Sequence, residues 1–172
     1  MNRLTPSAIE VEIAVAEYFN PRQNTIVPNV AWGMNFNYEL DLLVITRARY
    51  GYEVEIKISR HDLMRDVQKK HHHDSPKIKR LYFAIPEFLL QEQRHIPGNA
   101  GILVIKPTRE GGWRVHEERK PKSKSSYEFT DAEILTAERL GRLRVFPLKK
   151  QIVKLALEYL GKKKSKKQNQ RH

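Results

Sequence analysis

The stretch GYEVEIKIS, residues 51–59, has the alternating pattern of a β-strand. Its charged side chains, Glu53, Glu55 and Lys57, recur at every second position, and valine and isoleucine occupy the positions between them. Successive side chains of a strand point to opposite faces, so two carboxylates and one ammonium share a face. Such a face is either exposed to water or built to hold a metal ion and a water molecule.

The segments around this strand alternate between strand-like and helix-like patterns. Residues 38–45 precede it across a short polar link, which predicts an antiparallel hairpin. Ser59 then caps a predicted helix that runs to about residue 70. Two almost wholly apolar segments, 80–86 and 100–107, are typical of buried parallel strands. This order predicts an α/β fold with a mixed β-sheet flanked by helices.

Helices are also predicted toward both ends of the chain. The first begins at the Thr5-Pro6 pair and runs to about Phe19. Two more are expected at about 131–144 and 148–160. The last one carries apolar residues at helical spacing, which predicts that it docks on the domain.

These patterns divide the chain into three parts. We expect a core over residues 1–107 and a C-terminal extension over 108–161 that contains a hairpin or loop and the two helices. Residues 162–172 are Lys-rich and have no apolar side chain to bury, so we expect a basic, disordered tail.

The composition restricts the partners of the chain. Its 172 residues include 32 Lys or Arg and 20 Asp or Glu, a formal net charge of +12, which attracts polyanions such as nucleic acid. The absence of cysteine excludes disulfides, cysteine-based zinc sites and thiol nucleophiles. No apolar run approaches the ~20 residues that cross a bilayer, and glutamates interrupt the N-terminal segment where a signal peptide needs an apolar core. We expect a cytoplasmic protein that binds DNA, without a membrane partner or an organic cofactor.

Asp41 and the charged strand together predict a metal site. Asp41 lies on the strand before the hairpin turn, and Glu55 and Lys57 lie on the strand after it. Opposed residues of an antiparallel pair lie within ~5 Å of each other, so the two carboxylates can share a divalent cation. Lys57 then points at a water molecule or a phosphate oxygen. We expect Mg²⁺ or Mn²⁺ as the cofactor.

Asp41, thirteen intervening residues, Glu55-x-Lys57 and a following helix resemble the PD-(D/E)xK motif of restriction-endonuclease-like folds. Leu40 stands where that motif has proline. The stretches EVEIKISRHDLMRD, RLYFAIPE and AGILVIK are similar in order and spacing to the MmcB-like DNA repair family, over roughly residues 36–107. The resemblance implies a metal-dependent nuclease that hydrolyses DNA phosphodiester bonds, with Asp41 and Glu55 as metal ligands and Lys57 orienting water or phosphate.

The resemblance also implies an outer carboxylate ligand from the first helix. On a helical wheel, Glu12 lies within the apolar face that must pack on the sheet, whereas Glu10 and Glu17 lie on another side. A carboxylate on a buried face is costly unless a cation pairs with it. We predict Glu12 as a metal-binding and catalytic residue, with Glu10 in reserve.

Basic side chains outside this site are candidates for contacts with DNA phosphates. They come from the segment after the second helix and from the tail: Lys69, Lys70, His71, His73, Lys77, Lys162, Lys163 and Lys164. A zinc site on the three consecutive histidines is a weaker alternative, because loop histidines seldom bind zinc without further ligands. Glu53 is expected to be solvated, and Trp32 is expected in the core.

Two other functions stay open. A non-catalytic nucleic-acid-binding protein would keep the nuclease-like fold without cleavage. A basic structural protein of the ribosome or nucleoid would make the motif a coincidence. Metal-dependent DNA cleavage separates the nuclease from both, and the sequence does not decide whether the chain is a homodimer.

Overall fold

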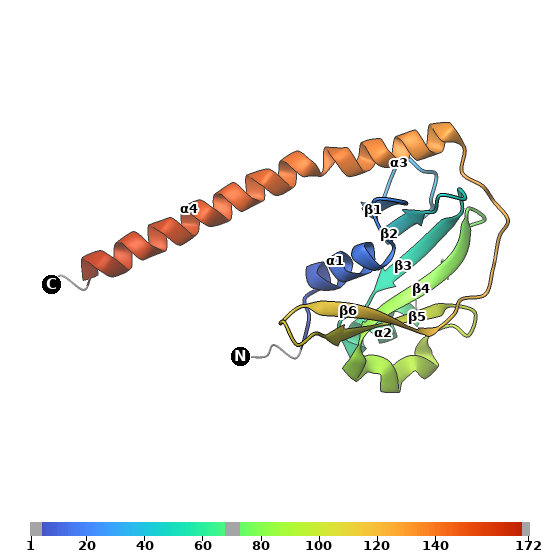
Figure 1. The fold of residues 1–172 in the computed structure, drawn as a ribbon, viewed down its shortest axis with the longest axis horizontal. Helices are drawn as coiled ribbons and strands as arrows, with labels where there is room; N and C mark the ends of the chain where they lie inside the picture. Colours follow the sequence, from blue (N-terminus) through green and yellow to red (C-terminus); the bar gives the residue numbers. More distant parts are fainter. Residues whose placement is uncertain (1–4, 68–72, 170–172) are drawn as a thin grey trace.

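The computed structural model describes residues 5–67 and 73–169 and has a six-stranded sheet at its centre (Figure 1). The strands follow chain order across the sheet: β1 (Thr25–Val30), β2 (Leu40–Ile45), β3 (Gly51–Ile56), β4 (Ile78–Pro86), β5 (Gly101–Pro107) and β6 (Trp113–Arg119). β3, β4 and β5 are parallel, and the other neighbouring pairs are antiparallel. The prediction of an α/β fold with a mixed sheet is confirmed.

Helices lie on both faces of this sheet (Figure 1). They are α1 (Ala8–Tyr18), α2 (Arg60–Val67), the 3-10 helix η1 (Glu87–His95) and α3 (Asp131–Leu143). A further helix, α4 (Val145–Asn169), follows α3. Ser59 caps α2 as predicted, since its hydroxyl accepts a hydrogen bond from the Asp62 N–H at 3.1 Å. The cap of α1 is Ser7 and not Thr5, because Ser7 and Glu10 form a reciprocal capping box.

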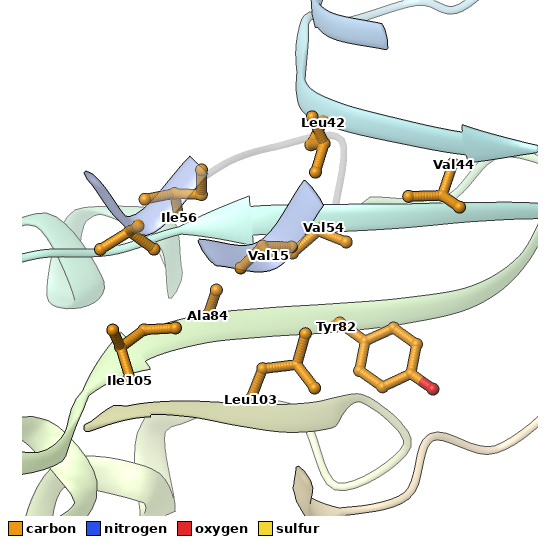
Figure 2. Packing of buried hydrophobic residues seen from close by; sticks show 10 residues of the cluster. Val15, Leu42, Val44, Val54, Ile56, Tyr82, Ala84, Leu103 and Ile105 are labelled. Atoms are coloured by element: carbon orange, nitrogen blue, oxygen red, sulfur yellow. The ribbon is translucent and has the colours of Figure 1, made fainter. Parts of the chain in front are cut away.

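The α1 face of the sheet holds one continuous apolar cluster (Figure 2). Val11 and Val15 of α1 are fully buried against side chains of the four central strands: Leu42, Val44, Val54, Ile56, Tyr82, Ala84, Leu103 and Ile105. Burying one such valine contributes about 1.5–3 kcal/mol relative to leaving it exposed. This cluster fixes α1 across the strands that carry the candidate site.

The opposite face has two separate apolar clusters. One joins β1 and β2 to α3 through Phe129, Ala137 and Leu140. The other joins β4 and β5 to α2 and η1 through residues such as Leu63 and Leu89. β3 lies between β2 and β4, so its charged side chains lie between these two clusters.

The C-terminal part differs from the sequence prediction in three respects. β6 extends the sheet beyond Pro107, and α3 contributes to the core, so residues 108–143 do not form a separate extension. α4 runs away from the domain instead of docking on it, and its Ile152 and Leu155 are 65% and 64% exposed (Figure 1). Helix also continues to Asn169, where a disordered tail is expected, because lysine and glutamine are favourable helix formers.

Trp32 also differs from its prediction. It was expected in the core but is 66% exposed, because it follows β1 at the edge of the sheet. Among the described residues, no helix combines the length and hydrophobicity that crossing a bilayer requires.

Candidate active site

The β2–β3 hairpin brings Asp41 and Glu55 together at its open end. The β2–β3 register ends at the Leu42–Val54 pair, and Asp41 and Glu55 are the next residues along the two strands. The Asp41 carboxylate accepts a hydrogen bond from the Ile56 N–H at 2.8 Å. This bond holds the carboxylate against the backbone of β3.

Lys57 joins the two carboxylates. Its Nζ lies 2.6 Å from Glu55 Oε2 and 3.8 Å from Asp41 Oδ2. Glu55 and Lys57 are buried, whereas the Asp41 side chain is 38% exposed. The backbone N–H of Lys57 donates to the Ala84 carbonyl at 3.0 Å, which extends the parallel β3–β4 pairing to this residue. The three motif side chains thus meet, with Asp41 on the solvent side.

Glu53 lies deeper on the same face and is fully buried, so the expectation of a solvated side chain is wrong. Its carboxylate accepts a hydrogen bond from the Tyr38 hydroxyl at 2.9 Å and lies 2.7 Å from His73 Nδ1. His73 Nδ1 also lies 3.6 Å from Glu55 Oε1. The segment before β4 therefore covers the face of β3 that carries Glu53 and Glu55. The alternation of charged residues alone predicted that this face is exposed to solvent.

His73 is not on a surface that contacts nucleic acid, contrary to the prediction. Its side chain is 3% exposed, and its imidazole meets the rings of Tyr38 and Phe83 edge-on, with centroids 5.8 Å away in each case. The Lys124 ammonium donates to the His73 carbonyl at 2.7 Å, and burial lowers the pKa of Lys124 against the opposing effect of the Glu53 and Asp74 charges.

Glu12, on α1, is near enough to Asp41 for the two charges to interact. Burial raises the pKa of Glu12, the negative charge of Asp41 raises it further, and Arg144 opposes both. Glu12 is half-buried and lines a groove of about 410 Å³ that also includes Trp32 and Arg144. The same helix does not bury all of its apolar side chains, since Ile9, one turn before Glu12, is 70% exposed.

Glu10, the reserve ligand, is engaged elsewhere. Its Oε2 accepts hydrogen bonds from the Ser7 N–H at 2.7 Å and from the Ser7 hydroxyl at 2.6 Å. These bonds belong to the capping box that pairs the backbone N–H groups at the start of α1. The structure therefore gives Glu10 the role of a helix cap.

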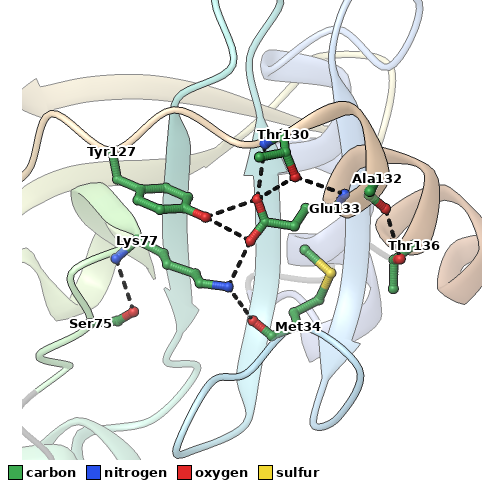
Figure 3. Close-up of polar contacts among 8 residues, drawn as sticks. All are labelled: Met34, Ser75, Lys77, Tyr127, Thr130, Ala132, Glu133 and Thr136. Atoms are coloured by element: carbon green, nitrogen blue, oxygen red, sulfur yellow. Dashed lines mark hydrogen bonds and ion pairs between the residues drawn. The ribbon is translucent and has the colours of Figure 1, made fainter.

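Lys77 is part of an internal network and not a surface contact for phosphates (Figure 3). Its Nζ lies 2.7 Å from Glu133 Oε1 and donates to the Met34 carbonyl at 3.1 Å. Glu133 also accepts hydrogen bonds from the Tyr127 hydroxyl and from Thr130. This network ties α3 to the segment that enters β4.

The remaining predicted contacts cannot be placed at side-chain level. Lys69, Lys70 and His71 lie outside the described residues. Lys162, Lys163 and Lys164 lie in the final turns of α4, where the structure describes the backbone course only.

Comparison with known proteins adds information on the fold alone. No protein-family model matches the chain, and a search of curated proteins finds no match. A solved structure of a protein of unknown function from Silicibacter pomeroyi has a similar fold, with a TM-score of 0.59 and 12% sequence identity over 86% of this chain and 91% of that one. The shared architecture is an α/β fold with a mixed sheet flanked by helices.

Proposed function

We propose that the chain is a metal-dependent nuclease with a restriction-endonuclease-like, PD-(D/E)xK fold, related to the MmcB-like DNA repair family. It hydrolyses DNA phosphodiester bonds in repair or a related DNA transaction. The observation that carries this proposal is the position of the Lys57 ammonium, 2.6 Å from Glu55 and 3.8 Å from Asp41 at the open end of the hairpin.

The donor set suits Mg²⁺ or Mn²⁺. Asp41 and Glu55 offer carboxylate oxygens from neighbouring strands beside the Lys57 ammonium, and Mg²⁺ is commonly held by one or two carboxylates together with substrate phosphates. Bound there, the cation would neutralise phosphate charge and make water a better nucleophile near neutral pH. Because Asp41 is 38% exposed, a phosphate can approach from its side.

Lys57 and Glu12 have separate roles in this proposal. The Lys57 ammonium, oriented by Glu55, donates to a non-bridging phosphate oxygen and stabilises the charge that develops as water attacks phosphorus. Glu12, whose charge interacts with that of Asp41, adds a further carboxylate to the proposed site. The +12 net charge supplies the attraction for the DNA backbone.

One observation favours the alternative, a non-catalytic nucleic-acid-binding protein. Glu55 is fully buried and Lys57 is 4% exposed, so their ion pair also serves as a structural element inside the domain. In that case the basic charge binds nucleic acid and the motif stabilises the fold.

A cleavage assay separates the two functions. Labelled single strands, duplexes, flaps and junctions are incubated with the full chain and Mg²⁺ or Mn²⁺, with EDTA as the metal-free control. Asp41→Asn is the informative variant, because it removes a ligand charge at a partly exposed position. Asp131→Asn, at a side chain that is 93% exposed on α3, is the matched control.

We expect Asp41→Asn to reduce metal-dependent cleavage at least 100-fold and to leave DNA binding within about threefold of the parent, whereas Asp131→Asn cuts normally. Binding without cleavage on every substrate would favour the alternative. Equal cleavage by Asp41→Asn and the parent would contradict the proposed site.

A further inference from the structure

Three ligating atoms converge on the buried side of the β3 face. Glu53 Oε1 lies 2.7 Å from His73 Nδ1, and Glu55 Oε1 lies 3.6 Å from the same nitrogen. One ligand atom from each of the three residues lies within 4.8 Å of the other two. In a tetrahedral zinc site with bonds of about 2.0–2.2 Å, ligand atoms lie about 3.3–3.6 Å apart, so small side-chain shifts suffice. We propose that Glu53, Glu55 and His73 bind a transition-metal dication, with Zn²⁺ as the best match.

The second oxygen of each carboxylate is held by another side chain. The Tyr38 hydroxyl donates to Glu53 Oε2 at 2.9 Å, and the Lys57 ammonium donates to Glu55 Oε2 at 2.6 Å. Both bonds leave the Oε1 atoms directed toward His73. Outer hydrogen bonds of this kind orient metal ligands and raise affinity.

The His73 side of the group is also fixed. Lys124 anchors its carbonyl, and the rings of Tyr38 and Phe83 bracket the imidazole. Residues 53 and 55 are on a central strand, and burial together with the contacts above holds His73 in the turn segment before β4. A preorganised set lowers the ordering cost of binding.

Charge and donor chemistry select the ion. Two fully buried carboxylates are expensive unless positive charge compensates them, and a dication adds two positive charges. An imidazole nitrogen beside carboxylate oxygens suits Zn²⁺, whereas Mg²⁺ and Ca²⁺ prefer oxygen ligands alone. This site shares Glu55 with the proposed nuclease site, but the inference does not rest on nuclease activity, because ion binding is measured without DNA.

The test is equilibrium dialysis of the chelator-treated full chain against Zn²⁺, followed by metal analysis, with calorimetric titration for affinity. His73→Asn is the main variant, since asparagine tolerates the positive φ of 52° at this position. Glu53→Gln keeps an acceptor for Tyr38. His116→Asn, on β6 with a side chain 59% exposed, is the matched control, and Asp41→Asn tests independence from the nuclease site.

We expect one Zn²⁺ per chain in the parent, His116→Asn and Asp41→Asn proteins, and at least a 30-fold loss of affinity in His73→Asn and Glu53→Gln. No stoichiometric Zn²⁺ in the parent, or unchanged affinity in His73→Asn, would overturn the inference. Because the variants can also fail to fold, zinc X-ray absorption of the parent is a second measurement. A shell with one imidazole and oxygen ligands supports the site, and a shell with two or more imidazoles overturns it.

Discussion

The charged face of β3 and the apolar face of α4 depart from the usual distribution of side chains in opposite directions. Glu53, Glu55 and Lys57 are buried inside the domain, whereas Ile152 and Leu155 of α4 are about two-thirds exposed. Buried charges and exposed large apolar side chains are the two observations about burial that carry the most information. Here they occur in one chain, which makes their consequences directly comparable.

The comparison shows which part of the chain the fold depends on. The buried charges of β3 meet partners inside the domain, among them Tyr38 and His73. No described side chain of α4 belongs to the three buried apolar clusters. A change on β3 should therefore alter the stability of the domain, and a change on α4 should not.

The largest effect is expected from Lys57→Met, which leaves the buried Glu55 carboxylate without its nearest cation. Removing one partner of a buried ion pair destabilises a protein by about 3–5 kcal/mol. Urea denaturation measures the loss. Lys106→Met, which breaks the more exposed pair with Glu87, is the control and should change the midpoint little. Equal effects of the two substitutions would remove the contrast between the β3 face and the surface.

Tyr38→Phe is expected to have the next largest effect. It deletes the hydroxyl that donates to Glu53, and a buried charged acceptor without its donor costs about 1–3 kcal/mol. Burial and the Glu53 carboxylate raise the pKa of Tyr38, so this hydroxyl keeps its proton over the whole working pH range. Tyr50→Phe, which removes an exposed bond to Glu128, should leave the denaturation midpoint almost unchanged. A Tyr38→Phe protein as stable as the parent would mean that Glu53 does not need this donor.

Glu133→Gln tests a partly buried charge and its dependence on pH. Burial alone raises the pKa of Glu133, but hydrogen bonds from Lys77, Thr130 and Tyr127 outweigh burial and hold the pKa at about 2. Since its ordinary pKa is 4.5, the carboxylate stabilises the fold above about pH 4.5, and this contribution is lost as the pH falls toward 2. We expect the Glu133→Gln substitution to lower the free energy of unfolding by about 1–2 kcal/mol at pH 7.

Denaturation of the Glu133→Gln protein and the parent from pH 7 to pH 2 checks the sign. The difference in the free energy of unfolding between the parent and the Glu133→Gln protein should become smaller as the pH falls from about 4.5 to 2. Glu138→Gln, on an exposed pair with Arg142 in the same helix, is the control and should show little gap at any pH. If this difference between the parent and the Glu133→Gln protein stays constant down to pH 2, the assigned hydrogen bonds to Glu133 are contradicted.

The smallest effect is expected from truncation after Arg144, which removes α4. Because the apolar side chains of α4 are largely exposed, the free energy of unfolding should change by less than about 0.5 kcal/mol. Thermal denaturation followed by circular dichroism measures the change. A loss above about 2 kcal/mol would mean that α4 packs on the domain, as its apolar spacing predicts from sequence.

Local pattern was enough to predict part of this structure. The β2–β3 hairpin follows from alternation around Glu55, and β4 and β5 follow from unbroken apolar runs between turn residues. Asp41 and Lys57 could be paired with Glu55 because antiparallel register relates residues that are close in sequence. Register and periodicity are local properties, so a single sequence carries them.

Long-range packing accounts for what could not be predicted. Alternation puts Glu53 on the face of Glu55 but does not say whether that face is covered, and His73 covers it from 20 residues away. Tyr38 has no local signal that it faces Glu53. On α4, apolar spacing identifies a face and not what lies against it, which is why docking was predicted for a helix that runs away from the domain.

Anomalous diffraction from Mn²⁺-soaked crystals of the full chain tests the central claim, that Asp41 and Glu55 form a metal centre with Lys57 beside it. We predict a Mn²⁺ peak within about 2.5 Å of a carboxylate oxygen of each residue. Ordered Asp41 and Glu55 side chains with no peak between them, and an unchanged ion pair between Lys57 and Glu55, would contradict it.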